Sequence, residues 1–298
     1  MLSILIPTYN YSIVKLVHEI HRQATLLNIT FEILCFDDGS TEKELIETNK
    51  EINNLAHTRY HILEKNIGRS AIRNLLAKKA KHEHLLFLDA DVLPKESNFL
   101  AKYIKEIKAD YPVIYGGIRY QEEKPAKDYI LRWKYGSSIE SKSASDRNKS
   151  KYASILFSNT IIKKSLFLKT QFSNKLSTYG HEDTLLAYSF QNLNTKVLHI
   201  DSPVFHIGLD SNKEYLKKTK EALNNLKYIE ANALVNAEFV KMLRFHKKLK
   251  SFKLNLVFAT IYTLFKRTME KNLISPNSSL KIYNLYRLSY FCYINKSE

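Results

Sequence analysis

Short apolar runs alternate with helical patterns over the first half of this chain. Four short runs rich in apolar residues are typical of buried strands: 2–6, 31–36, 60–63 and 84–88. Between these runs the apolar residues recur at helical spacing, in 12–27, 41–55 and 69–80. Strands that alternate with helices predict a mostly parallel sheet that is covered by helices on both faces. The first half of the chain is therefore expected to be α/β.

The second half carries fewer strand patterns and then none. Further strands are predicted at 112–118, 153–162 and 196–200. Residues 119–151, rich in Lys, Ser and Glu, are expected to form a mobile excursion of the kind that closes over substrates. From residue 211 onward the chain becomes helical. We therefore predict a catalytic domain over 1–210 and a helical extension over 211–298.

Polar clusters follow three of the predicted strands directly: "PTYN", "DDGS" and "DAD". Ligands of parallel sheets bind beyond the carboxyl ends of the strands. Three strand ends are therefore expected to meet at one crevice. Thr41 and Glu44 have the spacing of a capping box, which predicts a helix start beside the second cluster. Glycines are few, and four of them fall beside polar clusters: Gly39, Gly68, Gly180 and Gly208.

The positive charge lies mostly in the predicted extension. The chain has 46 Lys+Arg and 30 Asp+Glu, a net charge of +16. Residues 211–298 hold 17 of those basic and 6 of those acidic residues. A nucleic-acid-binding protein would line a groove with its basic residues and aromatic rings. Because the acidic clusters occupy the predicted crevice instead, no nucleic-acid partner is expected.

Cysteine usage and the first residues predict a cytoplasmic protein. Cys35 and Cys292 are far apart, and neither a disulfide framework nor a CxxC site is present. The first ten residues have the pattern of a strand rather than of a signal peptide. No run of 18 or more apolar residues is present, so a spanning helix is not expected.

Asp89 and Asp91 pose the main chemical question. Two carboxylates one residue apart repel each other unless a cation or hydrogen-bond donors compensate for their charge. A hard divalent ion that also binds a diphosphate would suit them, since such ions take oxygen ligands and accept substrate phosphates. A solvated turn is the alternative that these residues alone leave open.

Five elements in order resemble family 2 glycosyltransferases of the GT-A fold: "IPTYN", "DDGST", "NIGRSAIRN", "FLDADVLP" and "YGHEDTLLAYSF". They span about 2–190, and "VFHIGLDSN" near 204–212 extends the resemblance. It implies a Rossmann-like, mostly parallel sheet, and bacterial polysaccharide biosynthesis. The implied reaction is the inverting, metal-dependent transfer of a hexose or N-acetylhexosamine from a nucleotide, expected to be UDP, to a glycan or lipid-linked acceptor.

The resemblance also implies a nucleotide site. One turn would line it, with the Tyr9 ring against the base: Pro7, Thr8, Tyr9 and Asn10. A plain β-turn is the alternative. Asp38 would accept a hydrogen bond from the uracil ring, and Asp37 would support the turn. Arg69 and Arg73 lie one helical turn apart and would approach the nucleotide phosphates, with a surface salt bridge as the alternative for Arg73.

Metal ligands are implied in the same way. Asp91 would bind the ion, Asp89 the ion or the ribose, and His206 would complete the site. The ion would be Mn²⁺ or Mg²⁺, and a His ligand favours Mn²⁺ slightly. A structural role is the alternative for His206. His199 lies in an apolar strand pattern and is expected in the core.

"GHED" would supply the reacting carboxylates. By resemblance, Asp183 is the base that deprotonates the acceptor hydroxyl, and Glu182 holds the acceptor. The alternative is that both are helix N-terminal acids favoured by the helix dipole. The role of His181 stays open.

Residues 241–265 mix Lys and Arg with Leu and Phe. Such a segment favours peripheral contact with anionic lipid, on the inner face of the cytoplasmic membrane. A helical cap with a solvated basic face is the alternative. A different enzyme class, the sugar nucleotidylyltransferases, would need a Gly-rich loop after the first strand, and "PTYNYS" is not one.

Overall fold

The computed structural model describes residues 1–176 and 178–296 and divides into two compact units. The sheet unit consists of 1–121, 141–174 and 189–208. The helical unit consists of 122–140, 175–188 and 209–298. The last junction, at 208/209, is close to the predicted boundary at 210/211. Two earlier stretches of the chain also belong to the helical unit.

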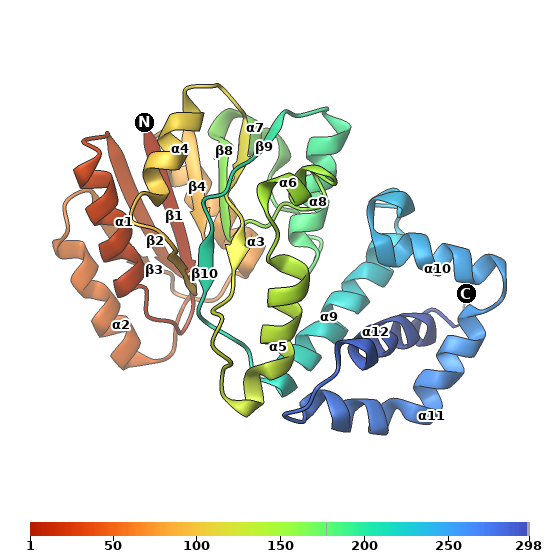
Figure 1. Ribbon diagram of the computed structural model, residues 1–298. Coiled ribbons are helices and arrows are strands. Elements are labelled where there is room, and N and C mark those ends of the chain that lie inside the picture. Colours follow the sequence, from red (N-terminus) through yellow and green to blue (C-terminus); the bar gives the residue numbers. More distant parts are fainter. Residues whose placement is uncertain (177, 297–298) are drawn as a thin grey trace. The chain divides into compact units, whose positions relative to one another are not determined.

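A seven-stranded sheet forms the centre of the sheet unit (Figure 1). Its strands are β1 Leu2–Thr8, β2 Phe31–Asp37, β3 Thr58–Ile62, β4 His84–Leu88, β6 Val113–Tyr115, β8 Asn159–Lys163 and β9 Val197–His199. They lie in the order β3-β2-β1-β4-β8-β6-β9, and only the β8 pairings are antiparallel. The prediction of an α/β fold with a mostly parallel sheet is confirmed.

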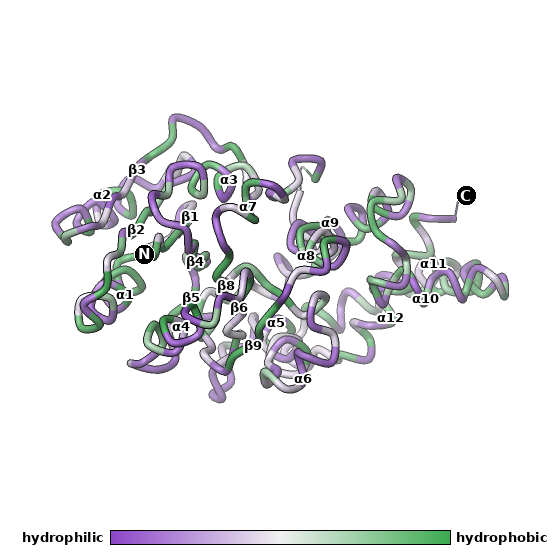
Figure 2. The backbone as a smooth tube through the Cα atoms, turned by 90° about the horizontal axis from the view of Figure 1, so that it is seen from above, coloured by the Kyte–Doolittle hydropathy of each residue, from purple (hydrophilic) through white to green (hydrophobic). Residues whose placement is uncertain are grey.

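Helices cover both faces of this sheet. α1 Val14–Leu26 packs with α4 Phe99–Ile107 on one face, and α3 Arg69–Lys79 packs with α7 Lys164–Thr170 on the other (Figure 2). Since both faces are covered, the central strands are apolar runs without alternation, and Leu2, Ile4, Leu5 and Ile6 are fully buried. The remaining helices of this unit are α2 Lys43–Lys50, η1 Glu51–Asn54 and α6 Ala144–Asn148.

The parallel register brings the first two strand ends to one level. β1 and β2 pair from Leu2–Phe31 to Thr8–Asp37, so both strands end side by side. A second, three-stranded sheet begins just after β4. It has the order β5-β10-β7, with β5 Val92–Pro94, β10 Val204–His206 and β7 Ile118–Arg119.

The predicted capping box does not form. α2 begins at Lys43 with Glu42 at its N-cap, and no side chain caps it. The reason is Asn10, whose Oδ1 accepts hydrogen bonds from the backbone N–H groups of Thr41 at 2.8 Å and Glu42 at 3.2 Å. A side chain from the first strand end therefore accepts from the Thr41 N–H, the donor that the Glu44 side chain was predicted to serve.

Two predicted strands are shorter than expected. Of 153–162, only the last four residues join β8, and residues 112–118 form β6 and β7 with a break between them. The break contains Gly116 and Gly117, and Gly117 has a positive φ of 94°. A Cβ at Gly116 would lie 2.4 Å from the Ser202 carbonyl, so another backbone segment crosses here.

The helical unit contains no strand among its described residues, as the pattern after 211 predicted. Its helices are η2 Lys127–Tyr129, α5 Ile130–Tyr135, η3 Gly136–Glu140, α9 Asn212–Ala231, η4 Ala237–Phe239, α10 Lys241–Ser251, α11 Asn255–Ile274 and α12 Leu280–Ile294. Helices thus occupy much of 119–151, where the composition predicted an excursion. α8, Glu182–Asn192, begins in the helical unit and ends in the sheet unit.

Candidate active site

The turns after β1 and β2 are joined by hydrogen bonds. The Asn10 N–H donates to Ser40 Oγ at 2.7 Å, and the Asp38 N–H donates to the Thr8 carbonyl at 2.8 Å. Thr8 is buried and Pro7 lies within β1, whereas Tyr9 is 49% exposed. The predicted nucleotide-binding turn thus presents one aromatic ring to solvent from a fixed backbone.

Asp37 supports the second turn, as the sequence predicted. Its carboxylate is fully buried, accepts a hydrogen bond from the Ser40 N–H at 2.7 Å and accepts a very short one from the Tyr60 hydroxyl. Gly39 follows with a φ of 72°, and a Cβ there would lie 2.8 Å from the Asn66 nitrogen. Only glycine fits this turn without displacing the neighbouring loop.

Asp38 holds a loop through both carboxylate oxygens. Oδ1 accepts from the Ile67 N–H at 2.7 Å, and Oδ2 accepts from the Gly68 N–H at 3.0 Å. Burial raises the pKa of Asp38, and the two backbone donors oppose that rise. Asp38 therefore fixes the approach to α3 in addition to any contact with a base. Sequence reasoning did not foresee this task.

Asp89 lies at the end of β4 between two guanidinium groups. Arg73 Nη2 is 2.5 Å from Asp89 Oδ1, and Arg69 Nη2 is 3.7 Å from Oδ2. Burial opposes ionisation, but the two guanidinium charges hold the pKa of Asp89 below its usual range. Arg73 is 2% exposed, so its ion pair is buried and is not the surface salt bridge considered as an alternative.

Asp91 faces a histidine from the second sheet. His206 Nε2 on β10 lies 3.4 Å from Asp91 Oδ2, and the His206 ring stacks on Tyr120 with 5.4 Å between ring centroids. The Asp91 carbonyl accepts from the Ile207 N–H at 2.9 Å, which ties the two segments together. Burial raises the pKa of Asp91, while the His206 charge would lower it. The sheet unit thus brings together two of the three predicted metal ligands.

Three further residues around Asp91 and His206 were missed as site residues. They are Tyr11, Tyr120 and Gly208. A Cβ at Gly208 would lie 2.5 Å from the Asp91 Cβ and 3.2 Å from the Tyr11 hydroxyl oxygen. Burial and then the charge of Asp91 raise the pKa of Tyr11. The position of Gly208 beside a polar cluster was a signal for close approach, whereas nothing in the sequence marked Tyr120.

The donor set suits a divalent ion that is shared with a substrate. Across residues 1–176 and 178–296, no group of three or more His, Cys, Asp or Glu side chains is placed to hold a metal. Two ligands at right angles on an ion with bonds of about 2.1 Å lie roughly 3 Å apart. The 3.4 Å between Asp91 Oδ2 and His206 Nε2 fits this requirement. Asp89 is already engaged by two arginines.

Glu182 and Asp183 occupy the first turn of α8, in the helical unit. The chain enters this helix through two residues with positive φ, Gly180 at 103° and His181 at 72°. A Cβ at Gly180 would lie 2.6 Å from the Ala222 Cβ on α9, so glycine permits the close approach. Burial lowers the pKa of His181 to about 4, and its Nδ1 lies 3.1 Å from Thr184 Oγ1.

One side chain on α9 holds the entry to α8. Asn225 is buried, and its Nδ2 lies within hydrogen-bond distance of three successive carbonyls: Thr178 at 3.0 Å, Tyr179 at 3.2 Å and Gly180 at 2.9 Å. Its Oδ1 accepts from the Thr178 hydroxyl at 3.0 Å. Asn225 therefore fixes the loop that precedes Glu182 and Asp183. No local sequence pattern predicted this contact.

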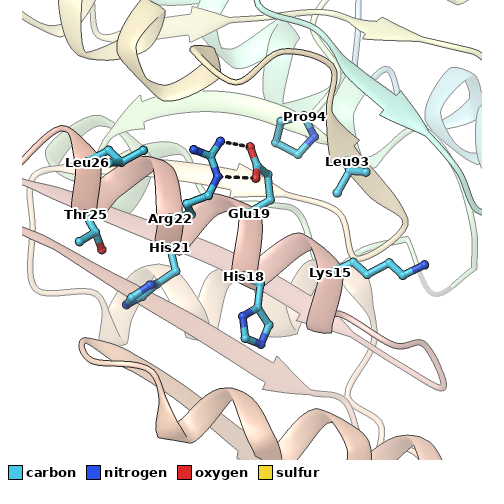
Figure 3. Close-up of a pocket in the computed structure, with 9 residues that line it drawn as sticks. All are labelled: Lys15, His18, Glu19, His21, Arg22, Thr25, Leu26, Leu93 and Pro94. Atoms are coloured by element: carbon cyan, nitrogen blue, oxygen red, sulfur yellow. Dashed lines mark hydrogen bonds and ion pairs between the residues drawn. The ribbon is translucent and has the colours of Figure 1, made fainter.

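A groove of about 790 Å³ lies elsewhere on the sheet unit, between α1 and β5 (Figure 3). It is lined by Lys15, His18, Glu19, His21, Arg22, Thr25, Leu26, Leu93 and Pro94. Glu19 and Arg22 pair with each other there at 2.7 Å. None of the predicted site residues lines this groove.

Comparison with known proteins identifies relatives of one kind. The model of a family described as glycosyl transferase family 2 matches residues 3–170. Glycosyltransferase GlyG of Streptococcus pneumoniae serotype 4 is 25% identical over 217 residues, which cover 69% of this chain and 69% of GlyG.

Solved structures share the fold. The mannosyltransferase PcManGT from Pyrobaculum calidifontis, in complex with GDP-Man and Mn²⁺, is 12% identical with a TM-score of 0.62, over 99% of this chain and 86% of that one. Residues 1–349 of S. aureus TarS, in complex with UDP-GlcNAc, are 18% identical with a TM-score of 0.54, over 99% and 92%. A longer TarS chain is covered over 38% of its length.

Proposed function

Because this chain belongs to glycosyl transferase family 2, we propose that it transfers a hexose or N-acetylhexosamine from UDP to a hydroxyl of a glycan, with inversion at the anomeric carbon. The chain is a glycosyltransferase with the GT-A fold. The sugar, the nucleotide, the acceptor and the stereochemistry are the parts that we propose.

The pair formed by Asp91 and His206 carries the proposal for the donor site. It lies just beyond β4 and close to Tyr11, which follows the neighbouring strand β1, at the end of a parallel sheet where ligands bind. Mn²⁺ or Mg²⁺ held by Asp91 and His206 would offset the negative charge of the leaving diphosphate. Support comes from PcManGT, whose complex contains GDP-Man and Mn²⁺.

The residues around this pair have distinct tasks in the proposed mechanism. Tyr9 offers its exposed ring to the base, as the TarS complex with UDP-GlcNAc makes reasonable for a uridine nucleotide. Asp38 and Asn10 hold the turns that carry that ring. Asp89 orients Arg69, whose half-exposed guanidinium group can donate to a phosphate oxygen. When Arg69 does so, the Asp89 carboxylate can accept a hydrogen bond from the ribose.

Asp183 acts as the base in the proposed transfer. Its carboxylate takes the proton of the acceptor hydroxyl while the hydroxyl oxygen forms a bond to the anomeric carbon. The bond from that carbon to the phosphate oxygen breaks on the opposite side, and the nucleoside diphosphate leaves with the electron pair. Glu182, one residue earlier in α8, positions the acceptor.

We also propose a place for the reaction. The buried free thiols of Cys35 and Cys292 favour a reducing compartment, so we place the enzyme in the cytoplasm. A lipid-linked acceptor would place it on the inner face of the cytoplasmic membrane, within cell-surface polysaccharide biosynthesis.

A donor screen tests the proposed function. The full chain is incubated with UDP- and GDP-linked sugars in Mn²⁺, in Mg²⁺ and in EDTA, and the release of nucleoside diphosphate is measured. We expect release from one UDP-sugar that depends on the ion. Preference for a GDP-sugar would overturn the choice of nucleotide, and equal rates in EDTA would overturn the metal requirement.

A further inference from the structure

The first half of α11 exposes apolar side chains to solvent. Of the large hydrophobic residues that are exposed in the described chain, a third fall within 245–265, where they are Phe245, Phe252, Leu254, Leu256, Val257, Leu264 and Phe265. Leu264 is 69% exposed and Phe265 is 53% exposed. Single exposed leucines are normal on soluble proteins, but a concentration of them indicates an interaction surface.

Within α11, Val257 and Leu264 lie on the face opposite the buried residues, and Phe265 flanks that face. The buried residues of this helix are Asn255, Ala259, Tyr262, Met269 and Leu273, and α11 packs against α12 along much of its length. Val257 and Leu264 are seven residues apart and therefore lie above one another on the outer face. The inner face of α11 is thus buried by intramolecular packing, whereas the apolar side chains of the outer face are exposed to solvent.

α10, which precedes α11 in the chain and contacts it, leaves cations in solvent. It buries Leu243, His246 and Leu249 and leaves Lys241, Lys247 and Lys248 in solvent. Figures 1 and 2 show the course of α10 and α11. Phe245 and Phe252 are exposed among these cations. From 241 to 271 the chain has nine Lys or Arg and a single acidic residue, Glu270.

An anionic bilayer surface satisfies both features together. Basic side chains interact with anionic headgroups, and an apolar helix face enters the boundary between headgroups and acyl chains. A symmetric contact with a second copy would bring the same positive charges together, which is unfavourable. None of the helices described is both long and apolar enough to cross a bilayer.

We propose that residues 241–267 form a membrane-docking face, in which Val257, Leu264 and Phe265 enter the interface of an anionic bilayer and the α10 cations contact its headgroups. The face lies within the helical unit, and all residues named for the donor site lie within the sheet unit. Docking is therefore separable from donor chemistry.

Vesicle binding by the full chain tests this face. We expect co-sedimentation with vesicles of phosphatidylcholine and phosphatidylglycerol, little with phosphatidylcholine alone, and weaker binding at high salt. The variant Leu264→Ser/Phe265→Ser and the variant Lys247→Gln/Lys248→Gln should each lower the partition coefficient about tenfold or more. Donor hydrolysis should stay unchanged in both variants. Loss of vesicle binding therefore tests the docking face, whereas loss of donor hydrolysis by the unchanged chain tests the proposed function.

Matched variants on the sheet unit serve as controls. Leu26 is 72% exposed, and Lys78 and Lys79 are an exposed pair at the end of α3, so Leu26→Ser and Lys78→Gln/Lys79→Gln should bind vesicles as the unchanged chain does. A polarity-sensitive dye on Leu264→Cys should shift its emission to the blue with anionic vesicles, and on Leu26→Cys it should not. This measurement does not depend on the loss of binding in a variant.

Three results would overturn the proposal. The first is that the unchanged chain does not bind anionic vesicles. The second is that the substitutions in 241–267 lower binding no more than the controls do. The third is a dimer in analytical ultracentrifugation that Leu264→Ser/Phe265→Ser converts to a monomer, which would assign the face to a second copy.

Discussion

Asp89 and Asp91 are separated by one residue and have different neighbours. Two arginines compensate for the charge of Asp89, whereas Asp91 has one histidine within 3.4 Å. Like charges at this spacing need separate compensation. The protein therefore supplies cations for Asp89, and we propose that a bound divalent ion supplies the cation for Asp91.

Substituting Asp91 tests this division. Asp91→Ala should weaken UDP binding at least tenfold in Mn²⁺ and much less in EDTA, because the variant loses a proposed metal ligand. Isothermal titration calorimetry measures both conditions. Asp110→Ala, which removes an exposed carboxylate, is the control. Equal losses with and without the ion would mean that Asp91 acts without a metal.

Substituting Asp183 tests the base. Asp183→Asn keeps the shape of the side chain but cannot accept the proton, so transfer to an acceptor should fall by roughly 10²-fold or more. Donor binding should remain, since Asp183 lies in the helical unit. Transfer and donor binding are measured on the same preparation. Turnover near that of the unchanged chain would remove Asp183 from this role.

His199 links stability to pH. The Arg147 Nε–H donates to its Nδ1 at 3.3 Å and its Nε2 lies 2.8 Å from the Lys151 carbonyl, so the ring is neutral and donates from Nε2. Burial lowers the pKa of His199 to about 4 from an ordinary value near 6.5. Between these values the unfolded chain binds more protons. The free energy of unfolding should therefore fall as pH drops from 6.5 towards 4.

The expected loss from this residue is about 1–2 kcal/mol over that interval. Urea unfolding at several pH values measures it, and His199→Gln should flatten the slope even if it lowers stability overall. An unchanged slope in the variant would show that other groups carry the dependence. The apolar strand pattern predicted a core position for His199 correctly, but the arginine that holds its tautomer lies 52 residues away in sequence.

At the scale of elements, α9 controls the start of α8. Asn225→Ala removes the hydrogen bonds to three carbonyls and to the Thr178 hydroxyl. We expect a loss of about 1–3 kcal/mol in stability, because buried acceptors lose their donors. Transfer should fall while donor binding is kept, because the loop before Asp183 is loosened.

Asn224→Ala is the matched control, since Asn224 is the exposed neighbour on the same helix. Thermal unfolding and transfer rates compare the two variants. If Asn225→Ala lowers stability but leaves the transfer rate unchanged, the contact is structural only.

Element types were more predictable from sequence than element ends. The apolar runs of β1, β2 and β4 were unambiguous because both faces of the sheet are covered. The start of α2 was predicted wrongly because Asn10, more than 30 residues away, supplies the acceptor. The polar clusters at strand ends were predictable because they follow the apolar runs directly in the sequence. Tyr120 and Asn225 were not predictable, because only tertiary contacts bring them to their positions.

At the scale of the whole molecule, the helical unit depends on its last helix. α12 buries Tyr283, Tyr286 and Phe291 in two clusters with residues of α9, among them Tyr215 and Leu226. A variant that lacks 241–298 should therefore expose these clusters, and α9 should become sensitive to proteases. Limited proteolysis with mass spectrometry measures this. Protection of α9 equal to that in the full chain would contradict the expectation.

The interleaving of the two units has a consequence for synthesis. The sheet unit is complete at residue 208, but 122–140 and 175–188 belong to a unit whose other part is 209–298. At about 5–20 residues per second, a ribosome needs roughly 5–20 seconds to make those last 90 residues. During this time the donor-binding strand ends can already form, while the loop before Asp183 still lacks Asn225. A nascent chain would therefore form the proposed metal-binding pair, Asp91 and His206, before the proposed base Asp183 is held in place.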